Sequence, residues 1–303
     1  METLIETNNT KTLMESFKQK ENSNNICAVI LNVNNDKFKT ETKPYNLKIF
    51  GKTMTEWVAN SVYDTNIKYA EYNFNDDFLP AVKQVADRNS ELTFVLFSDA
   101  PLFQRKTYLQ ILEYFKMKDL NVLKLTRGYV FKTEYLFNIN SLLSPQMQYF
   151  DEEDFITCYD LKQFSMVCDI MKNRILNYFM KNGVVIKDST STFIDADVQI
   201  EKGVIIEPYS IIKGKSIIEA NCVVGAHSVI ENSVVCENSI VNGCIIKNSF
   251  VGKNCVINEN VKIENNCKIE DGVNVPYACY LNNVIVKIED SLKSFYSYTA
   301  KED

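Results

Sequence analysis

The chain has 303 residues, a net charge of −6 at pH 7, and 46% hydrophobic against 24% charged residues. This length allows about two domains of ordinary size, and the acidic balance disfavours a nucleic-acid partner. Because no apolar run reaches about eighteen residues and no cationic leader precedes an apolar stretch, the sequence predicts a soluble, cytoplasmic protein without a membrane partner.

The first part of the chain alternates predicted strands and helices. Residues 1–24 are polar, and we expect them to form a mobile leader. Apolar runs at 26–31 and 92–97 predict buried parallel strands. The other predicted elements are helices at 54–63, 78–87 and 107–117, and strands at 121–125 and 129–131. This alternation predicts an α/β, Rossmann-like domain over residues 25–183, with helices on both faces of its sheet.

Two of the predicted helices have an apolar side. In the helix at 107–117 this side consists of Leu109, Ile111, Leu112 and Phe115. A longer amphipathic helix at 161–180 connects the two halves of the chain, and Gly183 is typical of a residue that ends a helix. Its predicted buried face is Leu161, Phe164, Cys168, Met171, Ile175 and Phe179.

The back half of the chain repeats one aliphatic residue with a step of six residues, shortened to five in three places. From Val198 onward, a Val, Ser or Cys precedes each aliphatic residue by two positions, and the position before that is usually Asn, Asp or Gly. This pattern predicts short strands joined by tight corners, with three strands in each coil of a parallel β-helix over residues 184–284. The repeated residues are Ile194, Ile200, Ile206, Ile212, Ile218, Val224, Ile230, Val235, Val241, Ile246, Val251, Ile257, Ile263, Ile269 and Val275.

Each residue class of the repeat has a predicted place. The aliphatic residue points inward, the small residue packs beside it, and the Asn, Asp or Gly adopts the positive φ of the corner. The polar and aromatic tail at 285–303 is expected to cover the last coil, whose edge would otherwise be exposed.

The nine cysteines are interpreted as structural. There is no CxxC pair and only one histidine, which argues against a zinc site. Small buried thiols without disulfides fit a reducing cytoplasm. Five of the cysteines occupy the small inward position of the repeat, namely Cys222, Cys244, Cys255, Cys267 and Cys279.

An α/β domain, a connecting helix and a hexapeptide repeat in this order resemble the bacterial bifunctional UDP-N-acetylglucosamine pyrophosphorylase / glucosamine-1-phosphate N-acetyltransferase family. The junction at 181–195, KNGVVIKDSTSTFID, is similar to that family's NGVTIIDPxSTYID stretch. The segments AVIL at 28–31, GKTM at 51–54 and SDAPL at 98–102 are similar to its AVILAAG, GKPM and GDxPL elements. The resemblance covers residues 26–280 and implies a nucleotidyltransferase-like domain followed by a left-handed β-helix.

The chain departs from this family where the family binds the nucleotide. The family has a glycine-rich loop with an Arg after the first strand, and a downstream Pro-Lys. Here the stretch at 32–45 has no Gly, Phe38 stands in the Arg position and Tyr45 in the Lys position. The resemblance leaves Asn34, Asn35 and Lys37 as candidate nucleotide-binding residues, with Lys39 and Lys43 as candidate catalytic cations.

The sugar-binding and uracil-binding segments of the family also have no clear counterpart. Only 28 residues separate Asp99 from Gly128, where the family resumes with a similar strand after a much longer segment. The family's LGTxHA segment is missing, and residues 78–81 are the nearest stretch.

The resemblance implies a Mg²⁺ ion bound between the Asp of the GDxPL turn and an Asn near the start of the connecting helix. Asp99 corresponds to the first ligand, whereas Tyr159 stands in the Asn position with Asp160 beside it. Asp99 and Asp160 are therefore the candidate metal ligands, since carboxylates suit Mg²⁺ better than a phenol. Alternatively, Asp99 is a turn residue after a strand.

His227, the sole histidine, has two interpretations. It could be the general base of an acyl transfer. It also stands at a corner position of the repeat, where a residue that tolerates positive φ is needed, and this second interpretation is favoured.

Three functions remain open at this stage. The favoured one is a sugar-nucleotide pyrophosphorylase-like protein whose catalytic signature is degraded and which serves as a binding, scaffold or regulatory subunit. The second is an active nucleotidyltransferase that makes a nucleotide-sugar from a sugar-1-phosphate and a nucleoside triphosphate, with Mg²⁺ as the possible cofactor. The third is a hexapeptide-repeat acyltransferase. The resemblance further implies a homotrimer formed through the β-helix, and a nucleotide or sugar phosphate as ligand.

Overall fold

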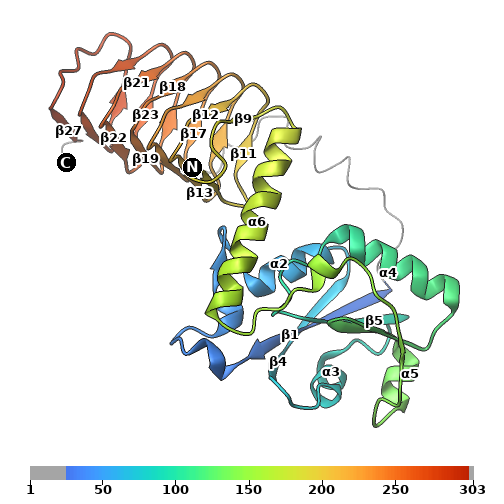
Figure 1. The fold of residues 1–303 in the computed structure, drawn as a ribbon. Coiled ribbons are helices and arrows are strands. Elements are labelled where there is room, and N and C mark those ends of the chain that lie inside the picture. The colour runs from blue at the N-terminus through green and yellow to red at the C-terminus, as the bar shows by residue number, and fades with distance from the viewer. Residues whose placement is uncertain (1–24, 300–303) are drawn as a thin grey trace. The chain divides into compact units, whose positions relative to one another are not determined.

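The computed structural model describes residues 25–299, so the predicted mobile leader at 1–24 lies outside the described residues. The chain divides into two compact units (Figure 1). Of the described residues, 25–46 and 54–159 form the first unit, and 47–53 and 160–299 form the second. The connecting helix belongs to the second unit, together with the β-helix.

The first unit contains a six-stranded mixed sheet with the strand order β4-β1-β5-β7-β6-β8. Strands β4 and β5 pair in parallel with β1, whereas β7 is antiparallel to both β5 and β6. The strands are β1 Ile26–Asn34, β4 Asn66–Asn73, β5 Leu92–Phe97, β6 Val122–Leu125, β7 Gly128–Lys132 and β8 Gln146–Met147.

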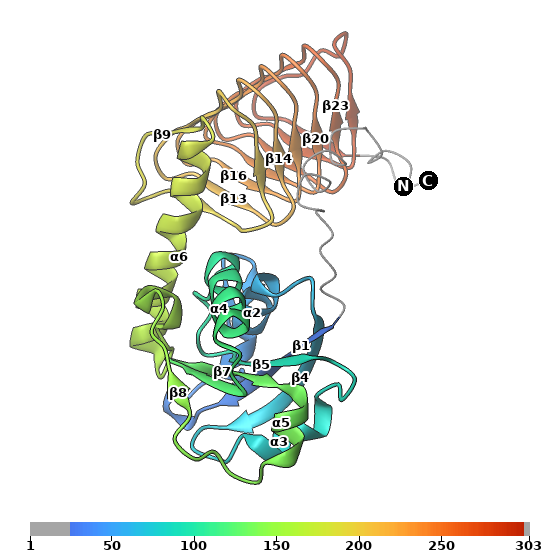
Figure 2. The ribbon, with the colours of Figure 1, turned by 90° about the vertical axis from the view of Figure 1, so that its right-hand side faces the viewer.

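Helices cover both faces of this sheet, as predicted. Helices α2 (Met54–Ser61) and α4 (Arg105–Lys118) pack on one face, and α3 (Leu79–Val85) and α5 (Thr133–Asn138) on the other (Figure 2). The strands at the centre are buried on both faces, which explains the continuous apolar runs of β1 and β5. The described part of the unit also contains the 3₁₀ turns η1 (Asp36–Phe38), η2 (Pro44–Asn46) and η3 (Glu152–Phe155).

Parts of the two predicted apolar helix faces are wrong. In α4, Leu109 is 47% exposed, and Tyr108 is buried instead, with its ring 4.9 Å from that of Phe94. In the connecting helix α6 (Leu161–Lys181), Leu161 is 49% exposed, because the buried stripe begins nearly two turns later at Val167. The buried residues of α6 are Val167, Met171, Leu176 and Phe179, and Phe164, Cys168 and Ile175 are half-buried.

The second unit is a left-handed parallel β-helix with three sheets along its sides (Figure 1). One sheet contains β10 Phe193–Ile194, β13 Ile211–Lys213, β16 Val229–Glu231, β19 Ile245–Lys247, β22 Lys262–Glu264, β25 Tyr280–Asn282 and β27 Ser297–Thr299. The second contains β11 Gln199–Ile200, β14 Ile217–Ile218, β17 Val234–Val235, β20 Phe250–Val251, β23 Lys268–Ile269 and β26 Ile285–Val286. The third contains β9 Val185–Ile186, β12 Ile205–Ile206, β15 Val223–Val224, β18 Ile240–Val241, β21 Val256–Ile257 and β24 Asn274–Val275.

The inward positions of the repeat are confirmed. Every aliphatic residue of the predicted series is buried except Ile200, which is half-buried against the same core. The small residues beside them are buried as well, and the buried serines donate to backbone carbonyls, either of their own coil or of a neighbouring one. For example, Ser239 Oγ donates to the carbonyl oxygen of Gly252 at 2.7 Å, and Ser228 Oγ to that of Val241 at 3.1 Å.

The corners of the coils have the predicted backbone conformation. Asn221, Asn238 and His227 have φ values of 59°, 60° and 60°. Asp197 is not among the positive-φ residues, so the prediction of a positive φ there is wrong. The Asp197 carboxylate accepts a hydrogen bond from Lys52 Nζ at 2.6 Å.

Two further segments complete the β-helix. A hairpin of β2 (Lys48–Ile49) and β3 (Lys52–Thr53) packs on the first coil, where the carbonyl oxygen of Phe50 accepts from the Ala196 N–H at 3.0 Å. At the other end, β26 and β27 pair with β23 and β25, so strand pairing continues into the tail expected at 285–303. Within residues 25–299, we find no helix whose length and hydropathy would let it span a membrane.

Candidate functional site

The candidate site lies at the carboxyl ends of β1, β4 and β5. Parallel strands present their following loops at the same edge of a sheet, which is where ligands of open α/β sheets bind. The turn between β6 and β7 joins this edge, because β7 is antiparallel to β5. This edge therefore carries the loop after β1, the segment after β5 and Arg127 of the β6–β7 turn.

The loop after β1 is closed by side chains and turns rather than by glycine. Asn35 caps η1, where its Oδ1 accepts from the Lys37 backbone N–H at 3.1 Å. The Asn35 amide also donates to the carbonyl oxygen of Tyr159 at 3.2 Å. Lys39 then reverses the chain with a φ of 51°. Asn35 thus supports the loop, and its amide group is already bonded within the protein.

Glu71 on β4 fastens the far end of the same loop, and we call its contacts the Glu71 clasp. Its carboxylate accepts from Tyr45 OH at 2.8 Å, from Asn34 Nδ2 at 3.0 Å and from Lys43 Nζ at 3.4 Å. Partial burial alone would raise the pKa of Glu71, but these hydrogen bonds and the charge of Lys43 lower it overall. The Glu71 clasp brings Asn34 and Lys43 together around a carboxylate.

Phe38 and Tyr45, which stand in the family's cation positions, point into the protein. Their exposed fractions are 2% and 6%. Burial raises the pKa of the Tyr45 phenol, so this residue stays neutral and donates its proton to Glu71. Neither residue offers a positive charge to a phosphate. The three nearby lysines, Lys37, Lys39 and Lys43, are exposed, and Lys43 is held by Glu71.

Asp99, the first candidate metal ligand, is already paired with an arginine. Arg127 Nε donates to Asp99 Oδ1 at 2.9 Å, and Arg127 Nη2 donates to Oδ2 at 2.6 Å. The exposed fraction of the Asp99 side chain is 3%. Burial raises the pKa of the Asp99 carboxyl, and the Arg127 guanidinium opposes that rise.

Asp160, the second candidate metal ligand, has a structural contact of its own. It is the N-cap of α6, where its Oδ1 accepts from the Gln163 backbone N–H at 2.9 Å. Asp99 and Asp160 belong to different compact units. Residues 25–299 contain no group of three or more His, Cys, Asp or Glu side chains that could hold a metal ion. The Asp99–Asp160 magnesium pair stays a prediction.

His227 lies at a β-helix corner, exposed and with a φ of 60°. Its ring stacks on that of Tyr209, the equivalent corner one coil earlier, with centroids 4.9 Å apart and planes 1° apart. A corner that needs positive φ accounts for the backbone of His227.

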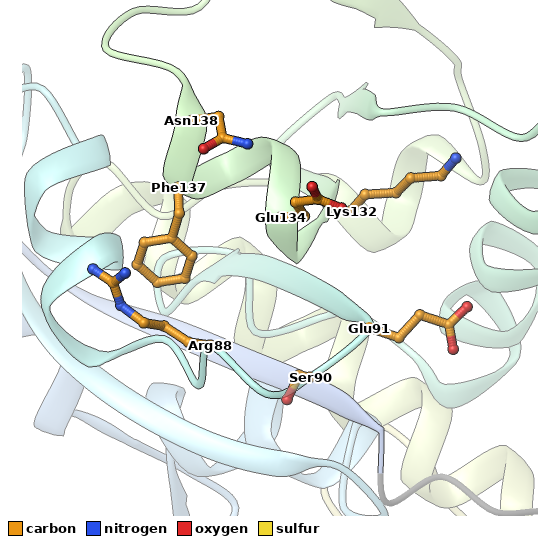
Figure 3. Close-up of a pocket in the computed structure, with 7 residues that line it drawn as sticks. All are labelled: Arg88, Ser90, Glu91, Lys132, Glu134, Phe137 and Asn138. Atoms are coloured by element: carbon orange, nitrogen blue, oxygen red, sulfur yellow. The ribbon is translucent and has the colours of Figure 1, made fainter.

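A pocket lies at the opposite end of β5 from Asp99 (Figure 3). It is lined by the segment before β5 and by α5, and the Arg88 guanidinium lies over the Phe137 ring at 4.2 Å from its centroid. Glu91 and Glu134 also line the pocket, and the ammonium of Lys132 pairs with Asp119 at 2.6 Å. None of the predicted site residues contributes to this pocket.

Residues 188–298 match the family model described as the GMPPB C-terminal domain. This domain is a left-handed β-helix of hexapeptide type that occurs in sugar nucleotidyltransferases. The match supports a relationship to the sugar-nucleotide pyrophosphorylase-like family, although not to the particular bifunctional family that the sequence resembles. The first unit lies outside the matched GMPPB segment, and no curated protein matches the chain.

Proposed function

We propose that the protein is a non-catalytic relative of the sugar-nucleotide pyrophosphorylases, which serves as a binding, scaffold or regulatory subunit. The burial of Phe38 and Tyr45 carries this proposal. A phosphoryl or nucleotidyl transfer needs cations and backbone N–H groups aimed at the phosphates, and one such donor is worth about 3–4 kcal/mol in the transition state. Here the two positions hold buried aromatic rings in a loop without glycine.

The Glu71 clasp supports the same proposal. In an active site of this kind, Asn34 and Lys43 would face the ligand. Here both side chains are bonded to Glu71, whose negative charge lies next to the place where a phosphate would bind. A carboxylate in that place weakens the binding of a phosphate through like-charge repulsion, which solvent partly screens because the Glu71 side chain is 55% exposed.

The partner and compartment are part of the proposal. We propose a homotrimer through the β-helix, with UDP-N-acetylglucosamine or a related sugar nucleotide of cell-wall precursor synthesis as the ligand class. Exposed aliphatic residues on one side of the β-helix, such as Val185 (50% exposed) and Ile240 (36% exposed), support association. All nine cysteines are free, which supports a reducing cytoplasm. Sedimentation showing a monomer at micromolar concentration would contradict the trimer.

The deciding experiment compares the wild type with a variant in which both cations are restored, Phe38→Arg/Tyr45→Lys. Turnover of UTP with N-acetylglucosamine-1-phosphate, and the reverse reaction with pyrophosphate, would be measured with and without Mg²⁺, alongside calorimetry with UDP-N-acetylglucosamine. We expect no turnover by the wild type under any of these conditions. Turnover by the wild type that falls on Lys39→Ala or Lys43→Ala would establish the nucleotidyltransferase alternative instead.

The acyltransferase alternative is tested by His227→Asn, because Asn keeps the corner conformation and removes the imidazole. With acetyl-coenzyme A as the donor, we expect the wild type and the variant to be equally inactive towards glucosamine-1-phosphate. Acetyl transfer by the wild type that disappears in the variant would overturn this expectation.

A further inference from the structure

Arg127 reaches Asp99 because of a tight hairpin. Leu125 pairs with Gly128 across β6 and β7, so the turn contains only Thr126 and Arg127. Gly128 has a φ of 140°, and a Cβ at this position would lie 2.7 Å from the carbonyl oxygen of Val95. Only glycine fits such an approach, and it holds the turn against the end of β5.

The guanidinium of Arg127 is fixed on its edge and on its face. The edge formed by Nε and Nη2 bonds both oxygens of Asp99 in the bidentate geometry that suits a carboxylate. The face lies over the Phe97 ring at 3.9 Å from its centroid, with the Phe74 ring at 5.8 Å. A side chain held in both ways stays in place even though 18% of it is exposed.

The residues around Asp99 do not fit a resident divalent metal ion. Mg²⁺ keeps several water molecules and takes carboxylate oxygens at close range. Both oxygens of Asp99 already receive N–H groups from Arg127, and the carboxylate is almost completely buried. A divalent ion would have to displace a cation that is itself fixed by aromatic contacts.

We propose that Arg127 is a built-in replacement for the metal ion: its guanidinium neutralises Asp99 permanently and makes this edge of the sheet independent of divalent metal. This inference deepens the proposed function. Arg127 is a positioning residue here, because it acts on Asp99 and on the segment that follows β5. The backbone at Asp99 makes a further contact, because the Asp99 carbonyl oxygen accepts from the Cys158 N–H at 2.7 Å.

The test uses thermal unfolding of the full chain with EDTA or with millimolar MnCl₂. For the wild type we expect the same melting temperature in both conditions. For Arg127→Met we expect a lower melting temperature in EDTA and a partial recovery with Mn²⁺, because the ion then replaces the lost charge. The recovery should disappear in Asp99→Asn/Arg127→Met, and this double variant should be more stable in EDTA than Arg127→Met alone.

Arg105→Met is the matched control. Arg105 also pairs with a carboxylate of the first unit through Nη1 and Nη2, and it lies over Tyr108 at 4.7 Å. Its partner Asp64 is 26% exposed, so water solvates it once the arginine is removed, and we expect no recovery with Mn²⁺. If Arg127→Met does not fold, Arg127→Lys is measured in its place. Because the lysine keeps a positive charge near Asp99, this variant should not respond to Mn²⁺.

Two results would overturn the proposal. The first is a wild type whose melting temperature rises with Mn²⁺ and loses that rise in Asp99→Asn. The second is an Arg127→Met variant that melts like the wild type or is not recovered by Mn²⁺. Neither result bears on turnover, which is measured separately, so the failure of this inference and that of the proposed function can be told apart.

Discussion

Buried polar groups have different kinds of hydrogen-bond partners in the β-helix and at the sheet edge of the first unit. In the β-helix, the hydroxyls of buried serines such as Ser228 and Ser239 bond to backbone carbonyls of a neighbouring coil. At the sheet edge, the buried charge of Asp99 depends on the single side chain of Arg127. The β-helix thus spreads its polar contacts over many equivalent positions, whereas the sheet edge concentrates them in one pair.

The apolar core of the β-helix should tolerate substitution much less well than its distributed polar contacts do. Ile218 is fully buried, and Ile218→Asp would place an unpaired carboxylate in a core without polar partners. We expect a loss of more than about 4 kcal/mol in the free energy of unfolding of the β-helix. Urea unfolding followed by circular dichroism would measure it.

The neighbouring residue provides the control for this prediction. Ile217 precedes Ile218 in the same strand and is only half-buried, because alternate residues of a strand face opposite ways. Ile217→Asp should cost less than about 1 kcal/mol. Equal losses in the two variants would show that the inward assignment is wrong.

Substitution of a glycine should also change stability by different amounts in the two regions. Gly128→Ala forces a Cβ towards the carbonyl oxygen of Val95 at a φ of 140°, and we expect it to cost about 2 kcal/mol. Gly243, at a β-helix corner with a φ of 49°, has only ordinary contacts around an added Cβ, and Asn occupies the same kind of corner elsewhere. Gly243→Asn should change stability by less than about 0.5 kcal/mol. Similar losses in chemical denaturation would remove the distinction between the two glycines.

The Glu71 clasp predicts a smaller effect. Tyr45→Phe removes one hydrogen bond to a carboxylate that keeps its bonds from Asn34 and Lys43, so we expect a loss of about 1 kcal/mol. Tyr69, on the same strand as Glu71, is 50% exposed, and Tyr69→Phe should leave stability unchanged. If calorimetric melting does not separate these two variants, the clasp contributes nothing to stability.

The smallest effect concerns acid stability of the loop before the first full coil. Hydrogen bonds from Ser191 and Thr190 lower the pKa of Asp188 from 3.8 to about 2. A carboxyl whose pKa is lowered on folding stabilises the protein above its unfolded pKa, and this contribution disappears as the pH falls from 3.8 towards about 2. The difference in urea midpoint between the wild type and Asp188→Asn should therefore shrink over that range. A difference that is constant with pH would contradict the role of the carboxylate.

The β-helix could be predicted from the sequence because three residue classes stay in phase in it. Each coil repeats the same requirement for an inward aliphatic, a small residue and a corner residue, so an error at one position, such as Asp197, does not obscure the rest. Strands β1 and β5 were equally clear, since burial on both faces leaves a continuous apolar run.

The edge of the sheet could not be predicted in the same way. Strand β4 is an edge strand with mostly exposed or half-exposed residues, and its structure comes from its pairing with β1. Because β4 was not predicted, the sequence did not place Glu71 beside Asn34. Arg127 left one signal, the three-residue gap with Gly128 between two predicted strands, which indicates a hairpin. Its partner Asp99 lies 28 positions away, and only the antiparallel pairing of β5 with β7 brings the two residues together.

The β2–β3 hairpin limits how the protein can be divided into fragments. The second unit is interleaved with the first along the chain, because residues 47–53 belong with residues 160–299. A fragment that starts at Asp160 would lack the acceptor for the Ala196 N–H and the cation that pairs with Asp197. Proteolysis or truncation between the units would therefore leave the first coil incomplete, whereas a fragment that carries residues 47–53 on a linker would restore both contacts.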